Sequence, residues 1–303
     1  MKILITGASA FAGFYAAQAL RRAGHSVQAL LRDGGTNRAE ELRRHEVGIV
    51  EGNVREPDTY RATLEQCDVV VHTMLDKDDP QGTDRRLFAA LKAVTSDPLR
   101  HRRLIYTTGC SIYGKVSERV MDETTRGNPA HTLHYRFELE QEALHLQGWS
   151  AIVLRSGFIY GNDGATSLSG GWFAQGEQGN VVYRGDPEKG WSWVHVDDLA
   201  EAYVRAVEGH TPGEIFCIAD EQRPRCIDVL IECARAAGFR GKVELAPIDS
   251  NDWENATFDQ NEFISSRKAG RLLGWSSRHP GILNEIDTYY ASWKATKTDS
   301  RDR

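Results

Sequence analysis

The residues best suited to chemistry lie at the start of the chain, in a loop that begins and ends with glycine. Lys2 to Thr6 is a short apolar run typical of a strand buried in a parallel sheet, and Phe14 to Arg22 favours a helix. The loop between them reads Gly7-Ala8-Ser9-Ala10-Phe11-Ala12-Gly13. Because backbone N–H groups and the positive end of the helix dipole meet at a helix start, this arrangement predicts a phosphate-binding site.

The place of the loop in the chain indicates what kind of phosphate compound it binds. Gly7 suits the tight turn, and Gly13 lets the helix pack closely against the strand. A glycine pair also occurs in ordinary α/β turns, but here a second strand follows at Ser26 to Leu31, as in a dinucleotide-binding βαβ unit. We predict that a dinucleotide is held by Gly7, Ser9, Ala10, Phe11, Ala12 and Gly13.

The end of the second strand bears on the choice between NAD and NADP. An acidic residue there would bond the ribose hydroxyls of NAD, whereas an arginine suits the additional 2′-phosphate of NADP. The strand ends in Leu30-Leu31-Arg32-Asp33. Arg32 stands in the closer position and favours NADP, while Asp33 keeps NAD as the second choice.

The elements that would position these residues alternate along the first half of the chain. Strand-like apolar runs at 68–72, 103–107 and 151–154 are separated by helical patterns, the longest at 132–146. Repeated βα units imply a parallel sheet covered on both faces, with ligands at the carboxyl ends of the strands. We predict an α/β fold, a Rossmann-type doubly wound parallel sheet with a smaller C-terminal substrate-binding lobe.

The pattern becomes loop-rich after residue 160, which indicates where the second lobe begins. Residues 1–160 are predicted to form the dinucleotide-binding domain, and 191–218 to return to it. Residues 161–190 and 219–296 are predicted to form the substrate lobe, followed by a flexible tail at 297–303.

Composition excludes several classes of protein. A net charge of −6 without a basic stripe argues against a nucleic-acid partner. Five cysteines without a CxxC spacing argue against zinc and disulfides, so we expect no metal. No run reaches about 18 apolar residues, so no membrane association is expected. A cytoplasmic protein with a small-molecule substrate is the simplest interpretation.

Six sequence blocks in a fixed order resemble one family. They are similar to the extended and atypical short-chain dehydrogenase/reductases of the NAD-dependent epimerase/dehydratase family. The blocks are TGASAFAG at Thr6 to Gly13, VVVH at Val69 to His72, TTGCSIYG at Thr107 to Gly114, LRSGFIYG at Leu154 to Gly161, WVHVDDLAEAY at Trp193 to Tyr203 and SSRKAGRLLGW at Ser265 to Trp275.

The resemblance implies further contacts to the cofactor. Residues near the adenine would be Asn53 and Val54, and residues along the ribose and phosphates Thr73 and Met74. Thr107 is assigned to the cofactor as well. Residues near the nicotinamide would be Ser156, Gly157 and Phe158, with Ser156 in place of the usual proline.

The catalytic residues that the resemblance implies are incomplete, so the active site is atypical. The family's Tyr-x-x-x-Lys becomes Tyr135 with Leu139 in place of lysine, and Gly109 replaces the hydroxyl residue four positions before Tyr113. Ala10 replaces the middle glycine of the loop. An unassisted tyrosine titrates near ~10 and is neutral at pH 7, so it donates a proton but does not accept one. Carbonyl reduction is therefore expected over alcohol oxidation.

A replacement for the missing hydroxyl is expected nearby. Residues two apart on an extended segment share a face, so Ser111 and Thr107 would point the same way as Gly109. Our hypothesis is that Ser111 or Thr108 orients a substrate carbonyl and Tyr135 donates the proton. The alternative is that Tyr135 only packs on an amphipathic helix.

The substrate is expected to be small or apolar. Its predicted walls, 162–186 and 249–263, hold large aromatic residues but few of the cations that a nucleotide sugar would need. The predicted substrate contacts are Tyr113, Trp172, Arg184, Trp191 and Trp253.

These observations favour an NAD(P)-dependent oxidoreductase that reduces, or transiently oxidises, a carbonyl or hydroxyl group. Two alternatives remain open because the lysine is missing. One is a non-catalytic protein that senses NADP or regulates a partner, and the other is an enzyme of this fold that uses no hydride transfer. The resemblance also implies a homodimer formed through the helix that carries Tyr135.

Overall fold

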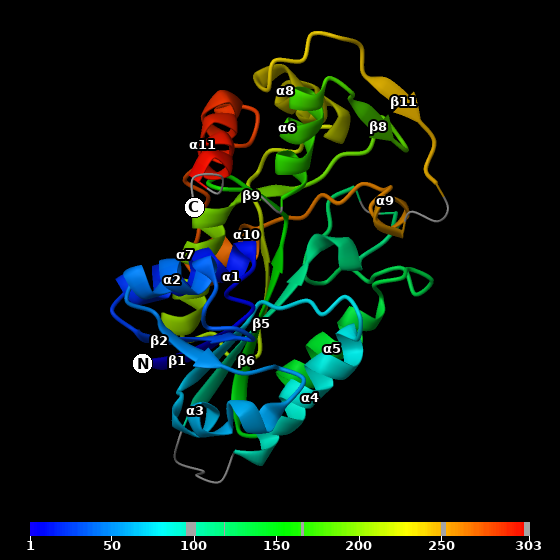
Figure 1. The fold of residues 1–303 in the computed structure, drawn as a ribbon. Coiled ribbons are helices and arrows are strands. Elements are labelled where there is room, and N and C mark those ends of the chain that lie inside the picture. Colours follow the sequence, from blue (N-terminus) through cyan, green and yellow to red (C-terminus); the bar gives the residue numbers. More distant parts are fainter. Residues whose placement is uncertain (95–100, 118, 165–166, 250–252, 300–303) are drawn as a thin grey trace.

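A parallel sheet forms the centre of the computed structural model, which describes residues 1–94, 101–117, 119–164, 167–249 and 253–299 (Figure 1). Within these residues the sheet has seven strands in the order β10-β6-β5-β4-β1-β2-β3. The order reverses between β1 and β4, and open sheets of this kind bind ligands at that point. The strands are β1 (Lys2–Thr6), β2 (Ser26–Leu31), β3 (Gly48–Glu51), β4 (Val69–His72), β5 (Arg102–Gly109), β6 (Trp149–Ser156) and β10 (Ile215–Ile218).

Helices cover both faces of the sheet because its strands are apolar on both sides. All four residues of β4, for example, are buried. One apolar core joins the sheet to α1 (Phe11–Arg22), α2 (Asn37–Arg44), α7 (Val196–Glu208) and α10 (Arg267–Leu272). A second core, on the opposite face, joins it to α3 (Arg61–Gln66), α4 (Pro80–Ala93) and α5 (Tyr135–Leu144). Two short 3-10 helices are η1 (Pro57–Thr59) and η2 (Cys110–Ile112).

The smaller lobe begins where β6 ends, since β7 follows it after a single residue, and it contains a third apolar core. Figure 1 places α6, α8, β8 and β11 together at one end of the molecule. The strands of the smaller lobe are β7 (Phe158–Tyr160), β8 (Val182–Arg184), β9 (Trp193–His195) and β11 (Glu244–Ala246). Its helices are α6 (Leu168–Gln178), α8 (Cys226–Ala236), α9 (Trp253–Thr257) and α11 (Ile286–Asp299).

The predicted α/β fold with a doubly wound parallel sheet is confirmed, while two predicted segments differ. The long helix begins at Tyr135 and ends at Leu144 rather than spanning 132–146. The predicted tail is helical as far as Asp299, because Lys297 bonds Glu177 of α6 and covers the ring of Trp293. Residues 300–303 lie outside the described residues. No helix in the described part of the chain is long and apolar enough to cross a membrane.

Candidate cofactor and substrate site

The glycine loop after β1 fits a dinucleotide phosphate. Gly7 has a φ of +79°, and a Cβ on Gly13 would lie 2.3 Å from the carbonyl oxygen of Gly7. Both positions therefore require glycine, which brings the loop close to Thr73 at the end of β4. Ala10 precedes α1 without a side-chain cap, and the first turn of α1 carries no acidic residue. The N–H groups at the start of α1 are thus available to an anion.

A cavity of about 390 Å³ continues from this loop across the ends of β1 to β4. It lies at the reversal of strand order, where an adenosine would be expected. Five of the residues that line it were assigned to the cofactor from the sequence, and Arg55 is an additional one. The five are Ser9, Ala10, Arg32, Asn53 and Val54.

The two charged residues after β2 face different surroundings. Arg32 is exposed and lines the cavity. The Oδ1 of Asp33 accepts a hydrogen bond of 2.7 Å from the backbone N–H of Gly35, so this carboxylate is directed to its own turn. The cavity therefore presents a cation at the position that decides between NAD and NADP.

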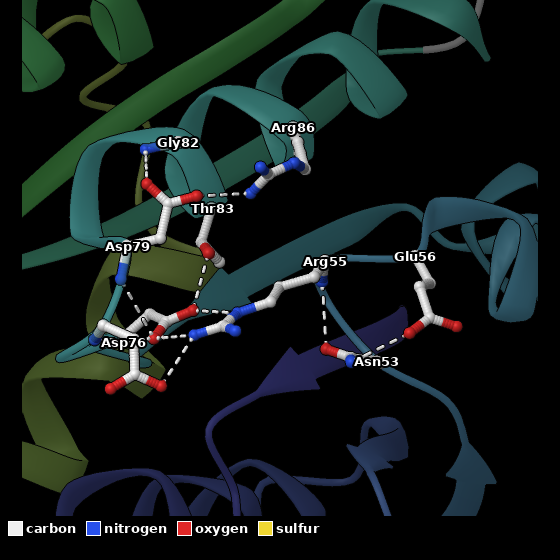
Figure 2. Close-up of polar contacts among 9 residues, drawn as sticks. Asn53, Arg55, Glu56, Asp76, Asp79, Gly82, Thr83 and Arg86 are labelled. Carbon is white, nitrogen blue, oxygen red and sulfur yellow. Dashed lines mark hydrogen bonds and ion pairs between the residues drawn. The ribbon is translucent and has the colours of Figure 1, made fainter.

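Arg55 closes the far side of the cavity by binding Asp76 (Figure 2). Its Nε and Nη2 atoms each lie 2.5 Å from a carboxylate oxygen of Asp76, and Thr83 donates a further hydrogen bond of 2.7 Å. These bonds hold the pKa of Asp76 well below its usual range. Arg55 thus links the loop after β3 to the loop after β4.

Asn53 has less freedom than the sequence suggested. Its Oδ1 accepts from the backbone N–H of Arg55 and its Nδ2 donates to Glu56, so its amide holds its own turn (Figure 2). Val54 is buried in the second core. Met74 is half-buried and lines the cavity, and the Oγ1 of Thr73 donates to the carbonyl oxygen of Thr6.

The hydroxyl residues at the end of β5 do not share one face, which corrects the predicted alternation. The strand ends at Gly109 and η2 begins at Cys110, so the two-residue period stops there. Thr107 lies 2.9 Å from the hydroxyl of Tyr203 on α7. Ser111 instead donates a hydrogen bond of 2.6 Å to the Oε2 of Glu262.

Thr108 is placed for structure rather than for substrate binding. Its hydroxyl is buried and donates to Glu140, whose carboxylate is paired at 2.5 Å with the Nη2 of Arg155. Ser156 is also buried, and its Oγ donates to the carbonyl oxygen of Thr108. The hydroxyl of Thr108 is thus engaged with Glu140 within the protein.

Glu262 is a site residue that sequence analysis missed. It is 1% exposed, and its Oε1 accepts from the Nε2 of Gln260 at 3.1 Å. Burial raises the pKa of Glu262 to about 7. No sequence signal marks it, because a single glutamate in a loop-rich segment is ordinarily exposed.

Helix α5 carries a buried cation, Arg136, although the family's lysine is replaced by Leu139. Leu139 is fully buried in the second core. Arg136 is 6% exposed and donates a 3.0 Å hydrogen bond to the carbonyl oxygen of Thr107. Tyr135, the preceding residue, packs half-buried against the second core. Arg136, the residue that directly follows Tyr135, therefore places a positive charge near it at a different position from the lysine of the family pattern.

Aromatic rings form one wall of the substrate side. Phe158 stacks on Trp191 with ring centroids 4.2 Å apart, and Trp172 stacks on Trp191 at 6.2 Å. The indole Nε1 of Trp191 donates to the carbonyl oxygens of Phe258 and Gln260, which fixes its orientation. Gly157 permits this packing, since a Cβ there would lie 2.7 Å from the carbonyl oxygen of Ser192.

Two of the other predicted substrate residues lie elsewhere. Tyr113 is fully buried, and its hydroxyl donates to the carbonyl oxygen of Asp122 and accepts from Arg155, so it is structural. Arg184 is exposed at the end of β8, where its carbonyl oxygen accepts a hydrogen bond from the buried Lys189. Trp253 begins α9, but its side chain lies outside what the structure describes.

A cluster at the start of α7 has metal-ligand residue types but a structural role. The ligand atoms of His195, Asp197 and His279 lie within 4.8 Å of one another. However, the Nδ1 of His195 accepts from the backbone N–H of Asp197, and the two imidazoles stack at 3.5 Å. His195 is therefore the cap of α7, and Asp198 accepts from backbone N–H groups at 278 and 279.

The model of one protein family, the NAD dependent epimerase/dehydratase family, matches residues 3–219. The chain belongs to this family. It is 27% identical to a 3-diazoavenalumate denitrifying reductase from a Streptomyces species, over 330 aligned positions that cover 100% of this chain and 98% of the relative.

Solved structures show that other members share the fold. A UDP-glucose 4-epimerase from Thermotoga maritima with UDP-glucose has 17% identity and a TM-score of 0.83, covering 98% of this chain and 100% of that one. A dTDP-glucose 4,6-dehydratase from Bacillus anthracis in complex with NAD has 16% identity and a TM-score of 0.83, covering 98% of both chains. These relatives are enzymes, and the chain has the fold of an NAD-dependent oxidoreductase.

The structure places two groups of predicted site residues at the carboxyl ends of the strands. The glycine loop and the adenosine cavity fit a dinucleotide. Around the end of β5, however, the groups brought together are Ser111, Glu262 and the aromatic wall.

Proposed function

We propose that the chain is an NAD(P)H-dependent reductase of a small aromatic substrate, with NADP preferred. The observation that carries the proposal is one juxtaposition at the end of β5. The carboxylate of Glu262 bonds the hydroxyl of the half-buried Ser111, and the backbone of Glu262 pairs with that of Trp191. Trp191 in turn stacks on Phe158, so Glu262 connects the serine to the aromatic rings. The wall offers stacking to a flat ring, and the hydroxyl offers a hydrogen bond.

The preference for NADP rests on Arg32. Arg32 lines the cavity, while the Oδ1 of Asp33 accepts from the N–H of Gly35. An arginine binds a phosphate by charge-assisted hydrogen bonds, and an available carboxylate would be needed to favour NAD. When bound, the reduced cofactor supplies a hydride.

The Streptomyces relative supports an aromatic electrophile as the substrate. Its name describes a reduction that removes the nitrogen of a diazo group. Two classes of aromatic compound accept a hydride in this way. An aryl-conjugated carbonyl gains a hydride and a proton, whereas an arenediazonium ion gains a hydride alone and releases N₂.

Carbonyl reduction needs a proton donor, and two hydroxyls are candidates. Tyr135 is the donor that the sequence pointed to, with Arg136 beside it. Ser111 is the second, with Glu262 behind it. Replacing Tyr135 by Phe removes the first donor alone, so unchanged turnover of a carbonyl probe by Tyr135→Phe would end its candidacy.

The test follows NADPH absorbance with cinnamaldehyde and with benzenediazonium as probes. We expect the enzyme to oxidise NADPH with at least one probe, faster than with NADH and above the rate without enzyme. UDP-glucose serves as the competing ligand, because some structural relatives act on nucleotide sugars. NADPH binding without oxidation by either probe, or micromolar binding of UDP-glucose, would overturn the proposal.

A further inference from the structure

We propose that Glu262, acting through Ser111, supplies the proton when this enzyme reduces a carbonyl group. The inference rests on the proposed function, and it assigns a role to a carboxyl group from the smaller lobe. Ser111 contacts the substrate, and Glu262 acts through Ser111.

The backbone fixes Glu262 in its place. Its N–H donates to the carbonyl oxygen of Gly190 at 3.0 Å, and its own carbonyl oxygen accepts from the N–H of Ser192 at 3.1 Å. Trp191 lies between Gly190 and Ser192 and forms an isolated β-bridge with Glu262. The carboxyl group is therefore held against η2 by the segment that supports the aromatic wall.

The groups around the carboxyl leave it able to carry a proton. Ser111 and the thiol of Cys110 face its Oε2, and Gln260 faces its Oε1. The buried Lys189 lies nearby, but its Nζ donates to the carbonyl oxygen of Arg184 and to the carboxylate of Asp259. Among the residues that the structure describes, Cys226 at the start of α8, a buried thiol, also faces it. Because Glu262 is desolvated and forms no ion pair with a cation in the described part of the chain, its protonated form is favoured near neutral pH.

A route connects the pair to solvent on one side and to substrate on the other. Ser111 is half-exposed, whereas Glu262 is buried, so a substrate meets the serine hydroxyl. Gln260 lines a cavity of about 590 Å³ together with His131, whose Nε2 donates to the carbonyl oxygen of Ser111 at 2.7 Å. This contact holds η2 in position, and Gln260, which hydrogen-bonds Glu262, connects the carboxyl to the lining of this cavity.

The step balances as a two-electron reduction. The substrate carbon accepts a hydride, with its electron pair, from the reduced nicotinamide of the bound cofactor. In the protonated form the carboxyl of Glu262 donates to the Ser111 oxygen across the 2.6 Å contact, so that the serine hydroxyl is directed at the substrate. The carbonyl oxygen takes the proton of the Ser111 hydroxyl, and Ser111 takes the proton of the Glu262 carboxyl. Glu262 is left as a carboxylate that accepts hydrogen bonds from Ser111 and Gln260, and it regains a proton from water.

The experiment compares two probes on the same loaded enzyme. Cinnamaldehyde needs a hydride and a proton, while benzenediazonium needs the hydride alone. The variants are Glu262→Gln, which keeps the side-chain volume, and Ser111→Ala. Matched controls are Glu244→Gln on the exposed strand β11 and Ser26→Ala at the exposed start of β2. Calorimetry with NADPH and thermal melting establish that each variant folds and binds cofactor.

We expect both site variants to lower kcat/KM for cinnamaldehyde by about 100-fold or more, in line with general acid catalysis. The wild-type rate with this probe should fall as the pH rises through about 7, and the Glu262→Gln rate should lose this dependence. Rates with benzenediazonium should stay within about twofold of wild type, because that reaction uses no proton. An unchanged aldehyde rate, or equal losses with both probes, would overturn the inference.

A second readout is independent of turnover. Infrared spectra of the apoprotein should contain a protonated-carboxyl band that titrates near neutral pH and is missing in Glu262→Gln. Absence of this band overturns the role of Glu262 even where hydride transfer occurs. Failure of the proposed function has a different signature, because wild type would then reduce neither probe.

Discussion

At the scale of single residues, the role of a charged side chain depends on the groups that surround it. Arg32 and Asp33 are adjacent and opposite in charge, yet Arg32 lines the adenosine cavity while Asp33 bonds its own turn. Glu262 illustrates the same point for a buried group. Its carboxyl is surrounded by a hydroxyl, an amide and a thiol rather than by a paired cation.

Replacing Arg32 by Ala should weaken NADPH binding and leave NADH binding unchanged. Loss of a charge-assisted hydrogen bond to phosphate costs about 1.5–3 kcal/mol, which is about 10- to 100-fold in Kd. Calorimetric titration of both cofactors measures this, with Arg44→Ala on α2 as the control for a lost surface arginine. Equal weakening of NADPH and NADH would show that Arg32 does not contact the 2′-phosphate.

Glu262 should make the stability of the protein fall between mildly acidic and neutral pH. Its pKa is about 7 in the folded chain and 4.5 for an ordinary glutamate, so the folded state binds more protons within this window. Stability therefore falls as the pH rises from about 4.5 to about 7, and the loss is then complete.

Glu262→Gln should remove this fall, which amounts to a difference on the order of 3 kcal/mol across the window. Urea unfolding of both proteins at several pH values measures it. Burial also raises the pKa of Asp220 to about 7, but Asp220 is common to both proteins and cancels in the comparison. Parallel stability curves for the two proteins would contradict the raised pKa of Glu262.

At the scale of elements, the site depends on how α5 and η2 meet the sheet. The buried pair of Glu140 and Arg155 ties α5 to β6, and Thr108 on β5 donates to the same carboxylate. The carbonyl oxygen of Thr107, also on β5, accepts from Arg136 of α5. The hydroxyl of Ser111 follows two residues beyond β5, so its position depends on this anchoring.

Glu140→Gln should therefore destabilise the fold strongly. Removing one partner of a buried ion pair leaves an uncompensated charge and costs about 3–5 kcal/mol. Glu142→Gln on the same helix is the matched control, because its pair with Arg85 is exposed and contributes at most about 1 kcal/mol. Chemical unfolding measures both variants, and similar losses for the two would contradict a structural role of the buried pair.

Sequence patterns predict elements better than they predict the site. Local composition predicts buried strands such as β4, because a short apolar run is typical of them. It also predicts the glycine loop, because the conformation of that loop requires glycine. The direction of Ser111 does not, since the strand period ends where η2 begins. Glu262 and Arg136 were missed for a related reason: their burial results from contacts between segments far apart in the chain.

At the scale of the whole molecule, two lobes meet at the end of β5 and β6. The smaller lobe contributes Trp172, Trp191 and Glu262, while the sheet contributes the cofactor cavity and Ser111. Cofactor binding and substrate recognition are thus assigned to different lobes. Changes in one lobe should affect one of these properties more than the other.

Trp172→Ala should weaken recognition of aromatic probes without affecting the cofactor. An aromatic contact contributes about 0.5–1.5 kcal/mol, so the KM for cinnamaldehyde should rise about 2- to 10-fold. The KM for acetaldehyde and the Kd for NADPH should not change, and Trp172→Phe should restore most of the loss. An equal rise for both aldehydes would contradict stacking as the source of specificity.

The central claim is that this chain transfers a hydride from NADPH to an aromatic substrate. The most direct measurement uses NADPH deuterated at the transferred position, prepared as each of the two C4 epimers, with cinnamaldehyde and benzenediazonium as acceptors. We predict that one epimer places a single deuterium in the product, detected by mass spectrometry. A product without deuterium from either epimer, or no product from a protein that binds NADPH, would contradict the claim.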